Sequence, residues 1–271
     1  MIVCVLLPRF EIAVAAGGRE ALLRGPAALA PAPSSGDGGG EVGEVSAAAE
    51  AFGVRAGMRL GEALARCPQL TLVLPDPAGV AEAWEHVLAR LESIGAAVAP
   101  ERPGLVCFEE RGLRSLHGGT EGVIAATRRA LRRPGGRIGV GPSRFCALAA
   151  AARARPRRAE VVGGDRAAAR AYLAPLPVAL LRARADLVVP ETLEQLGVRT
   201  LGELAALPRA AVADRFGAAG LRVHELARGR DEPLRPRRPG ERLTESLELA
   251  ESASGPQLEH ALGLLIDRLL A

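Results

Sequence analysis

The stretch Ser46–Leu74 reads SAAAEAFGVRAGMRLGEALARCPQLTLVL and contains signals for two helices and a strand in quick succession. Its first part predicts a helix that ends near Gly53. Leu60–Arg66 predicts a second helix, and the alternation in Leu70–Leu74 predicts a strand. We therefore expect a small folded unit in this part of the chain.

Strands and helices alternate on both sides of this stretch. Ile2–Leu7 is apolar throughout and stops at Pro8, a pattern typical of a strand buried on both faces of a sheet. Residues 31–40, PAPSSGDGGG, favour neither a helix nor a central strand, so we expect a mobile loop there. Further helices are predicted over Val80–Ile94, Val123–Leu131 and Phe145–Arg153, and further strands over Leu105–Phe108 and Arg137–Val140.

From about Arg166 the sequence predicts helices alone. We expect them to be divided by prolines and glycines, namely Pro175, Pro177, Pro190, Pro208, Gly197, Gly202, Gly217 and Gly229. Arg235–Pro239 (RPRRP) predicts an extended, solvated linker, because its prolines forbid a helix. A new element is expected from Leu243. Its helix Gln257–Leu270 carries an apolar stripe that no later sequence covers, which indicates an unfinished domain.

The composition predicts a globular protein with aliphatic cores. Of the 271 residues, 48% are apolar and only 3% are aromatic, so base stacking on exposed rings is not expected as a main binding mode. All 35 basic residues are arginine, and the formal net charge is only +4. The arginines nevertheless gather at 128–137, 153–158 and 228–238, which favours a polyanionic partner.

Several classes of site are not indicated. Cys4, Cys67, Cys107 and Cys146 stand far apart in apolar surroundings, so we expect reduced core thiols and no zinc or other metal site. The four histidines form no cluster, and no GxSxG elbow indicates a hydrolase. GGRIGVG at 135–141 lacks the spacing of a dinucleotide loop. No apolar run is long enough to span a membrane, so a cytoplasmic, nucleoid-associated protein without a membrane partner is expected.

Three segments resemble parts of the Y-family (UmuC/DinB-like) DNA polymerases, and in particular the ImuB-type, catalytically inactive branch. Ser46–Leu74, with its FGV, GM and CP elements, resembles the fingers. Residues 197–236, with LGELAALP and RFG, resemble the thumb, and residues 138–156, IGVGPSRFCALAAAARARP, resemble a palm strand, turn and helix.

The resemblance implies an α+β fold. It comprises a palm with a mixed sheet plus helices, a small fingers domain, an all-helical, helix-hairpin-helix-like thumb and a truncated little finger. The implied boundaries are 1–10 and 76–165 for the palm, 11–75 for the fingers, 166–235 for the thumb, and 236–271 for a linker and the start of the little finger.

The resemblance also implies that catalytic groups are missing. Two divalent ions need carboxylates to hold them, but Leu6 and Pro8 occupy the first acidic positions of the family. Arg102-Pro103-Gly104 occupies the place of the second acidic pair, with Glu101, Glu109 and Glu110 displaced on either side.

The nucleotide contacts implied by the resemblance are degenerate as well. Ala47 and Glu50 stand at the family's Tyr and Arg positions, and Glu50 would repel a triphosphate. Only Arg155 keeps a cation that would point towards the triphosphate.

These features predict a non-catalytic factor in mutagenic translesion synthesis that binds primer-template or damaged DNA and uses no cofactor. The candidate DNA-contacting residues are Arg153, Arg155, Arg157, Arg158, Arg199, Arg228, Arg230, Arg235, Arg237 and Arg238. The resemblance implies three protein partners, namely an error-prone replicative-type polymerase, a recombinase-related accessory protein and the sliding clamp. Gln69–Leu74 superficially resembles a clamp-binding peptide, but its alternation favours a core strand.

Two alternatives remain open. The chain could be an active low-fidelity polymerase in which Glu101, Glu109 and Glu110 hold Mg²⁺. It could also be a truncated relic without a role on DNA. Primer extension separates the first alternative from the scaffold hypothesis, and DNA binding separates the second.

Overall fold

The computed structural model describes residues 1–19, 23–31, 40–131, 135–155, 157–184, 188–238, 247, 249 and 254–270. Most of the loop expected at 31–40, and most of residues 243–253 at the start of the element expected from Leu243, lie outside these residues. The chain divides into two compact units, Met1–Arg237 and Arg238–Ala271.

Five strands of the first unit form one sheet within the described residues. The order is β4 (Val98–Arg102), β5 (Leu105–Glu109), β1 (Ile2–Leu6), β6 (Arg137–Gly141) and β7 (Glu160–Val161). All neighbours are antiparallel except β6 and β7. Because β1 occupies the centre, both of its edges and both of its faces are covered, which explains its continuous apolar sequence.

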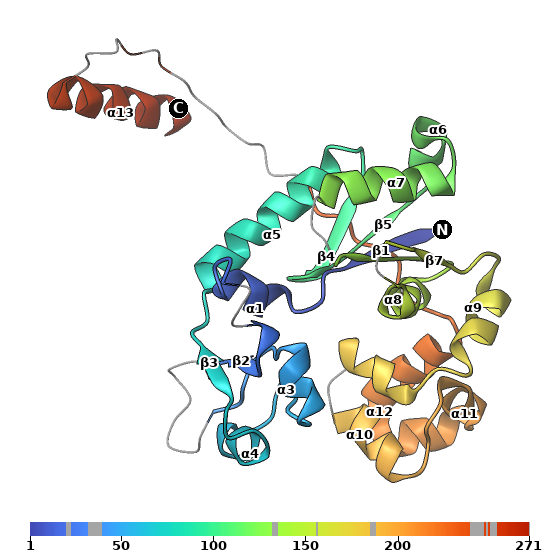
Figure 1. Ribbon diagram of the computed structural model, residues 1–271. Helices are drawn as coiled ribbons and strands as arrows, with labels where there is room; N and C mark the ends of the chain where they lie inside the picture. Colours follow the sequence, from blue (N-terminus) through green and yellow to red (C-terminus); the bar gives the residue numbers. More distant parts are fainter. Residues whose placement is uncertain are drawn as a thin grey trace. The chain divides into compact units, whose positions relative to one another are not determined.

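Helices cover both faces of this sheet (Figure 1). Side chains alternate along β1, so that Val3 and Val5 belong to the core under α5 (Pro77–Glu92) and α7 (Thr120–Leu131). Cys4 points the other way, into the core under α8 (Arg144–Arg153). The short helix α6 (Leu113–His117) precedes α7.

A smaller unit is built around two parallel strands, β2 (Ala27–Leu29) and β3 (Thr71–Val73). The helices α1 (Phe10–Ala15), α3 (Ala47–Ala51) and α4 (Leu60–Arg66) accompany it (Figure 1). The core strand predicted at Gln69–Leu74 is corrected here. Leu70 and Val73 are buried in two different small cores, but Leu72 is 40% and Leu74 80% exposed, so this strand is only partly a core element.

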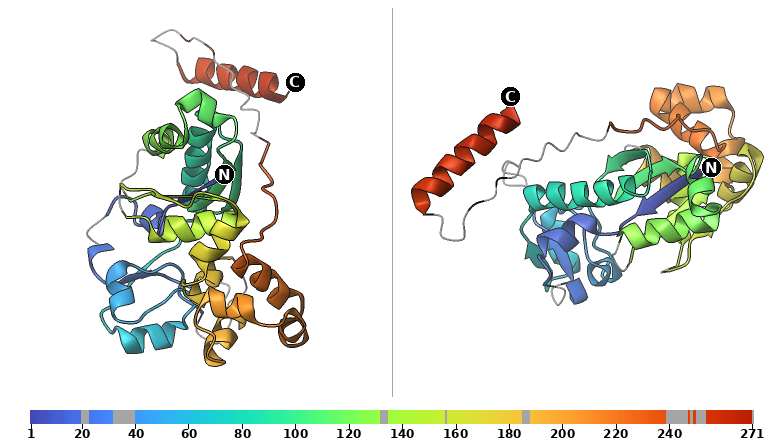
Figure 2. Two further views of the ribbon diagram at one scale, coloured as in Figure 1. Left: turned by 90° about the vertical axis from the view of Figure 1, so that its right-hand side faces the viewer. Right: turned by 90° about the horizontal axis from the view of Figure 1, so that it is seen from above.

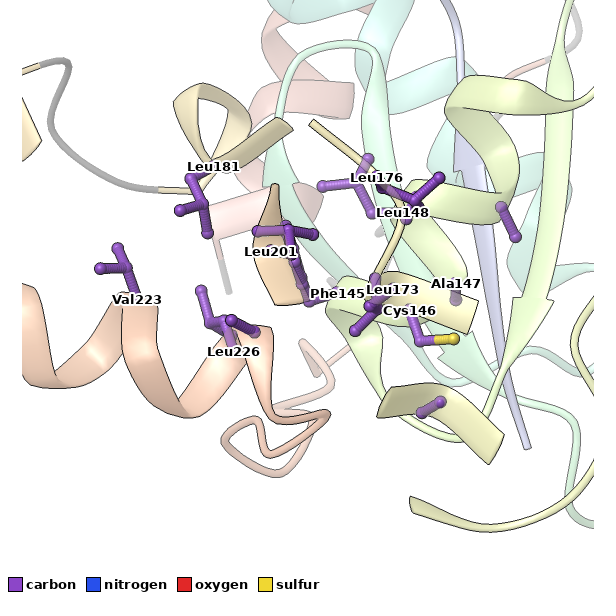
Figure 3. Packing of buried hydrophobic residues seen from close by; sticks show 14 of the residues in the cluster. Phe145, Cys146, Ala147, Leu148, Leu173, Leu176, Leu181, Leu201, Val223 and Leu226 are labelled. Carbon is purple, nitrogen blue, oxygen red and sulfur yellow. The ribbon is translucent and has the colours of Figure 1, made fainter. Parts of the chain in front are cut away.

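The region after residue 165 contains only helices among its described residues, as predicted. These are α9 (Arg166–Leu173), the 3₁₀ helix η1 (Val178–Ala183), α10 (Val188–Gln195), α11 (Leu201–Ala206) and α12 (Arg209–Ala227). Their leucines join Leu148 and the other buried residues of α8 in one core (Figure 3). This shared core packs the helices α9 to α12 against α8 and the face of the sheet that α8 covers.

Two of the predicted helix breaks are wrong. Pro190 lies inside α10, where it is the third residue and therefore costs no hydrogen bond. Gly202 lies inside α11 and packs against Ala174. Gly217 does interrupt the regular geometry, because it has φ 58° and divides α12 at a kink.

The hydroxyl of Thr200 accepts a hydrogen bond from the Glu203 amide at 3.2 Å, and the Glu203 carboxylate closes a capping box at the start of α11. We expect Thr200→Ala to lower the free energy of unfolding by about 1 kcal/mol. Urea denaturation measures the loss. Thr192→Ala is the matched control, because the Thr192 hydroxyl only bonds back to the Val188 carbonyl within its own helix. Equal losses in both variants would contradict the role of the cap.

In the second unit, α13 (Gly255–Leu270) carries the predicted apolar stripe. Leu258, Leu262 and Ile266 on this stripe are exposed.

Candidate functional site

The two chain segments that the resemblance associates with acidic residues meet in space. The Leu7 amide donates to the Gly104 carbonyl at 2.7 Å, which joins the end of β1 to the turn between β4 and β5. Gly104 has φ +81°, and an added Cβ would lie 2.8 Å from the Leu7 carbonyl oxygen. The two segments therefore lie side by side, and the residues at the positions expected to be acidic are Leu6, Pro8 and Pro103.

These residues do not fit a pair of magnesium ions. Hard divalent cations take carboxylate and carbonyl oxygens, and neither segment offers a carboxylate at the junction. Within the described part of the chain, no three His, Cys, Asp or Glu side chains are grouped so that they could hold a metal ion.

Glu109 and Glu110 lie at the opposite end of the sheet from Leu6. They therefore cannot replace the acids that the resemblance expects beside Leu6. Glu109 is opposite Ile2, whereas Leu105 is opposite Leu6, so four strand residues, or roughly 13 Å, separate Glu109 from the junction. Glu110 is buried, accepts a hydrogen bond from the Thr120 hydroxyl at 2.9 Å and lies 3.7 Å from the N-terminal amine. Its environment indicates a structural role.

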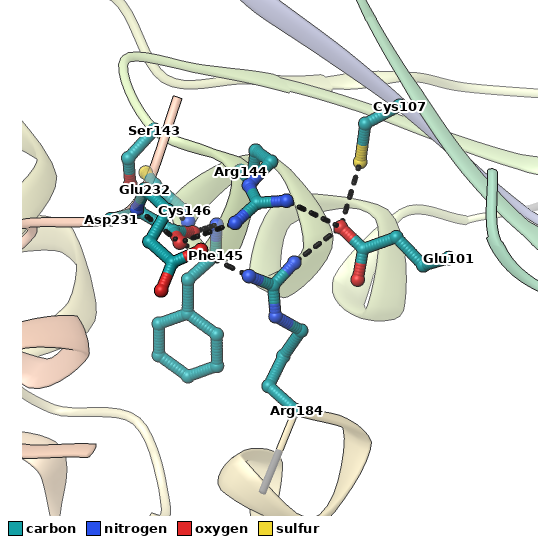
Figure 4. Close-up of polar contacts among 9 residues, drawn as sticks. All are labelled: Glu101, Cys107, Ser143, Arg144, Phe145, Cys146, Arg184, Asp231 and Glu232. Carbon is teal, nitrogen blue, oxygen red and sulfur yellow. Dashed lines mark hydrogen bonds and ion pairs between the residues drawn. The ribbon is translucent and has the colours of Figure 1, made fainter. Parts of the chain in front are cut away.

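Glu101 lies nearer the junction but belongs to a buried ion-pair cluster with Arg144, Arg184 and Asp231 (Figure 4). Asp231 accepts from Arg144 at 3.1 Å, from Arg184 at 3.0 Å and from the Phe145 amide at 2.8 Å. The Glu101 carboxylate contacts Arg184 directly and lies 3.8 Å from Arg144. Two carboxylates thus balance two guanidinium groups, and Glu101 is held by protein cations.

Ala47 and Glu50, the positions that the resemblance compares with a Tyr and an Arg of the family, lie on α3. Glu50 accepts from Arg9 at 2.5 Å, and Arg9 also donates from Nε to the Val45 carbonyl at 3.0 Å. Arg9 adopts a left-handed backbone, with φ 55°, directly after Pro8. The negative charge of Glu50 therefore faces a cation of the same chain, which sequence reasoning missed because the two residues are distant in sequence.

Glu44 makes a second connection between these segments. Its carboxylate accepts from the backbone amides of Glu11 at 2.8 Å and Ile12 at 3.2 Å, at the start of α1. Burial raises the pKa of Glu44, although the Ile12 and Glu11 amides act in the opposite direction.

The predicted DNA-contacting arginines differ in exposure and in their partners. Those exposed to solvent are Arg153, Arg155, Arg157, Arg158, Arg199, Arg230, Arg235 and Arg238. Arg228 is half-buried and, together with Arg230, Arg166 and Arg170, lines a cavity of about 350 Å³. Arg230 also pairs with Glu225 at 2.9 Å.

Arg237 requires a correction. Its guanidinium binds Glu85 at 2.6 Å and Glu92 at 2.7 Å on α5, and its amide donates to the Val98 carbonyl at 2.8 Å. The hydrogen bonds that Arg237 donates to the Glu92 and Glu85 carboxylates raise the pKa of Arg237 further. This part of the expected solvated linker is therefore fixed along α5 and the edge strand β4, and Arg237 is not available to phosphates.

Sequence reasoning missed a second set of arginines. Arg102, Arg182, Arg184 and Arg222 line a cavity of about 440 Å³ together with Glu101, Leu105 and Ala183. The sequence shows Arg102 directly beside Pro103-Gly104. Arg182, Arg184 and Arg222 are distant in sequence, and only the packing of η1 and α12 brings them near Arg102.

The four cysteines are free and buried, as predicted. Burial raises the pKa of the Cys146 thiol to about 12, which keeps it protonated. No helix in the described ranges combines the length and apolarity that a membrane crossing requires.

Comparison with known proteins gives consistent results. Residues 6–152 match the impB/mucB/samB family. The chain is 30% identical over 201 residues to a protein of Caulobacter vibrioides named DNA polymerase IV, an alignment that covers 72% of this chain and 49% of the relative. The chain spans about half the length of the curated relatives it matches.

Solved structures have the same fold. A Y-family DNA polymerase chimera, Dbh-Dpo4(243-245)-Dbh, superposes with a TM-score of 0.67 and 18% identity, covering 88% of this chain and 70% of the chimera. DinB from Sulfolobus solfataricus gives a TM-score of 0.65 and 18% identity, covering 87% and 70%.

Proposed function

Because the chain belongs to the impB/mucB/samB family and has the Y-family polymerase fold, we propose that it binds DNA during translesion synthesis without adding nucleotides itself. The observation that supports this proposal is the contact between Leu7 and Gly104. It joins the two segments expected to carry metal-binding acids, and the side chains there are those of leucine and proline.

Protein partners belong to the same proposal. A chain of this kind would position a separate error-prone replicative-type polymerase at a lesion, assisted by a recombinase-related protein and the sliding clamp. We also propose the four-part division into palm, fingers, thumb and the start of a little finger. The five-stranded sheet, the small β2–β3 unit and the helices after residue 165 agree with it.

An active low-fidelity polymerase is the second candidate. The relatives named DNA polymerase IV favour it. It would require carboxylates near Leu6, and Glu101, which lies on β4, is paired with Arg184 and Arg144.

Two assays on one preparation separate the candidates. We expect the purified chain to bind a primer-template duplex in a salt-dependent manner and to leave the primer unextended with either Mg²⁺ or Mn²⁺, while an active Y-family polymerase extends it. Extension by this chain would overturn the scaffold proposal in favour of the second candidate. Absence of both binding and extension would indicate a chain without a role on DNA.

A further inference from the structure

The cavity of about 440 Å³ is lined by residues of the sheet, of η1 and of α12. It lies at the end of the sheet where the resemblance places metal-binding acids, near Leu6. Arg102 ends β4 and is opposite Leu105, which in turn is opposite Leu6. Arg182 and Arg184 approach from η1 and the residue that follows it, and Arg222 from α12. The cavity therefore borders the junction where a family member with metal ions would concentrate positive charge.

Most of the carboxylates near this cavity are already neutralised. Glu101 and Asp231 balance Arg184 and Arg144, and Arg182 pairs with Glu194 at 2.6 Å. Arg102 and Arg222 are exposed. Arg222 has no ion-pair partner among the described residues, and Arg102 has none either, although its charge lowers the pKa of Glu44.

Two residues that line this cavity also border a second cavity. Arg184 and Arg222 line a neighbouring space of about 530 Å³ between α12, the start of α8 and residues 230–232. Arginine forks suit phosphate oxygens, which they bind in a bidentate manner. A strand of linked phosphates could therefore contact successive guanidinium groups along the shared wall.

We propose that Arg102 and Arg222 bind backbone phosphates of a DNA strand in this cavity, and that their charges make a divalent cation unnecessary there. The inference rests on the proposed function, since it names the phosphate contacts through which DNA is bound. No bond is made or broken, and the ligand is the phosphodiester backbone of the strand.

The test measures fluorescence anisotropy of a labelled primer-template duplex with the full chain. At constant ionic strength, native affinity should be unchanged when Mg²⁺ is replaced by EDTA. Arg102→Glu/Arg222→Glu should weaken binding by about tenfold or more and reduce the slope of log affinity against log salt by about 2. Arg102→Gln/Arg222→Gln should lose the same slope without added repulsion.

The matched control is Arg90→Glu/Arg114→Glu, which makes the same charge change at exposed positions on α5 and α6. It should retain the native slope. If the native chain binds DNA but the Arg102/Arg222 variants behave like this control, or if EDTA abolishes native binding, the inference is overturned and the proposed function stands. If the native chain binds no DNA at all, the proposed function itself fails.

Discussion

Asp231→Ala is expected to lower the free energy of unfolding by about 3–5 kcal/mol, because it leaves two buried guanidinium groups without one of their two carboxylates. Asp231 is only 4% exposed and also accepts from the Phe145 amide in the first turn of α8. Its removal therefore takes away an ion-pair partner and a helix cap together. Urea denaturation followed by circular dichroism measures the change.

The control is Glu232→Ala, which removes the same charge from the adjacent, exposed residue. We expect its unfolding free energy to stay within about 0.5 kcal/mol of the native value. A similar loss in both variants would mean that net charge, rather than the buried cluster, determines the effect.

The same ion-pair cluster also supports the arginine-lined cavity of about 440 Å³. Glu101 comes from the sheet, Arg144 from α8, Arg184 from the residue after η1 and Asp231 from the segment after α12. It therefore holds the helices that carry Arg182 and Arg222 against the strand that carries Arg102. A loosened cluster would separate the two sides of the cavity, so Asp231→Ala should also weaken DNA binding.

The regular elements could be predicted because local signals decide them. Leu60–Arg66 was predicted with the bounds that the structure has, and α8 within one residue, since Ser143 accepts from the Cys146 amide as an N-cap. β2 and β7 were missed because so few residues show no clear period, and β4 (Val98–Arg102) was missed because it contains a proline and two charged residues. The exposure of Leu72 was missed because alternation in sequence does not tell whether both faces of a strand are covered.

The site could be predicted only in part. The positions of Leu6 and Pro8 follow from the first strand, whose sequence identifies its own end. The ion-pair partners of the charged residues cannot be predicted in this way. Arg9 and Glu50, like Arg237 and Glu92, are brought together only by the tertiary fold. Runs of arginine in sequence thus overstated the importance of Arg237 and overlooked Arg222.

Two glycines of β6, Gly139 and Gly141, allow α8 to pack closely against this strand. Along β6, Ile138 and Val140 point into the core under α5 and α7, which leaves Gly139 and Gly141 facing α8. A Cβ added at Gly139 would lie 2.1 Å from the Ala151 amide nitrogen and 2.2 Å from the Ala147 carbonyl oxygen. The helix backbone therefore packs directly on the strand backbone, at a distance that only glycine permits.

We expect Gly139→Ala to cost about 3 kcal/mol or more, because the atoms in the way belong to the backbone of α8 and no side-chain rotation can relieve the overlap. Displacing α8 would also shift Arg144 and the Phe145 amide away from Asp231, so the melting temperature and DNA affinity should fall together. Gly163→Ala, where an added Cβ meets no atom within 4 Å, provides the control and should melt close to the native protein. A Gly139→Ala variant as stable as this control would show that α8 does not need its close approach to β6.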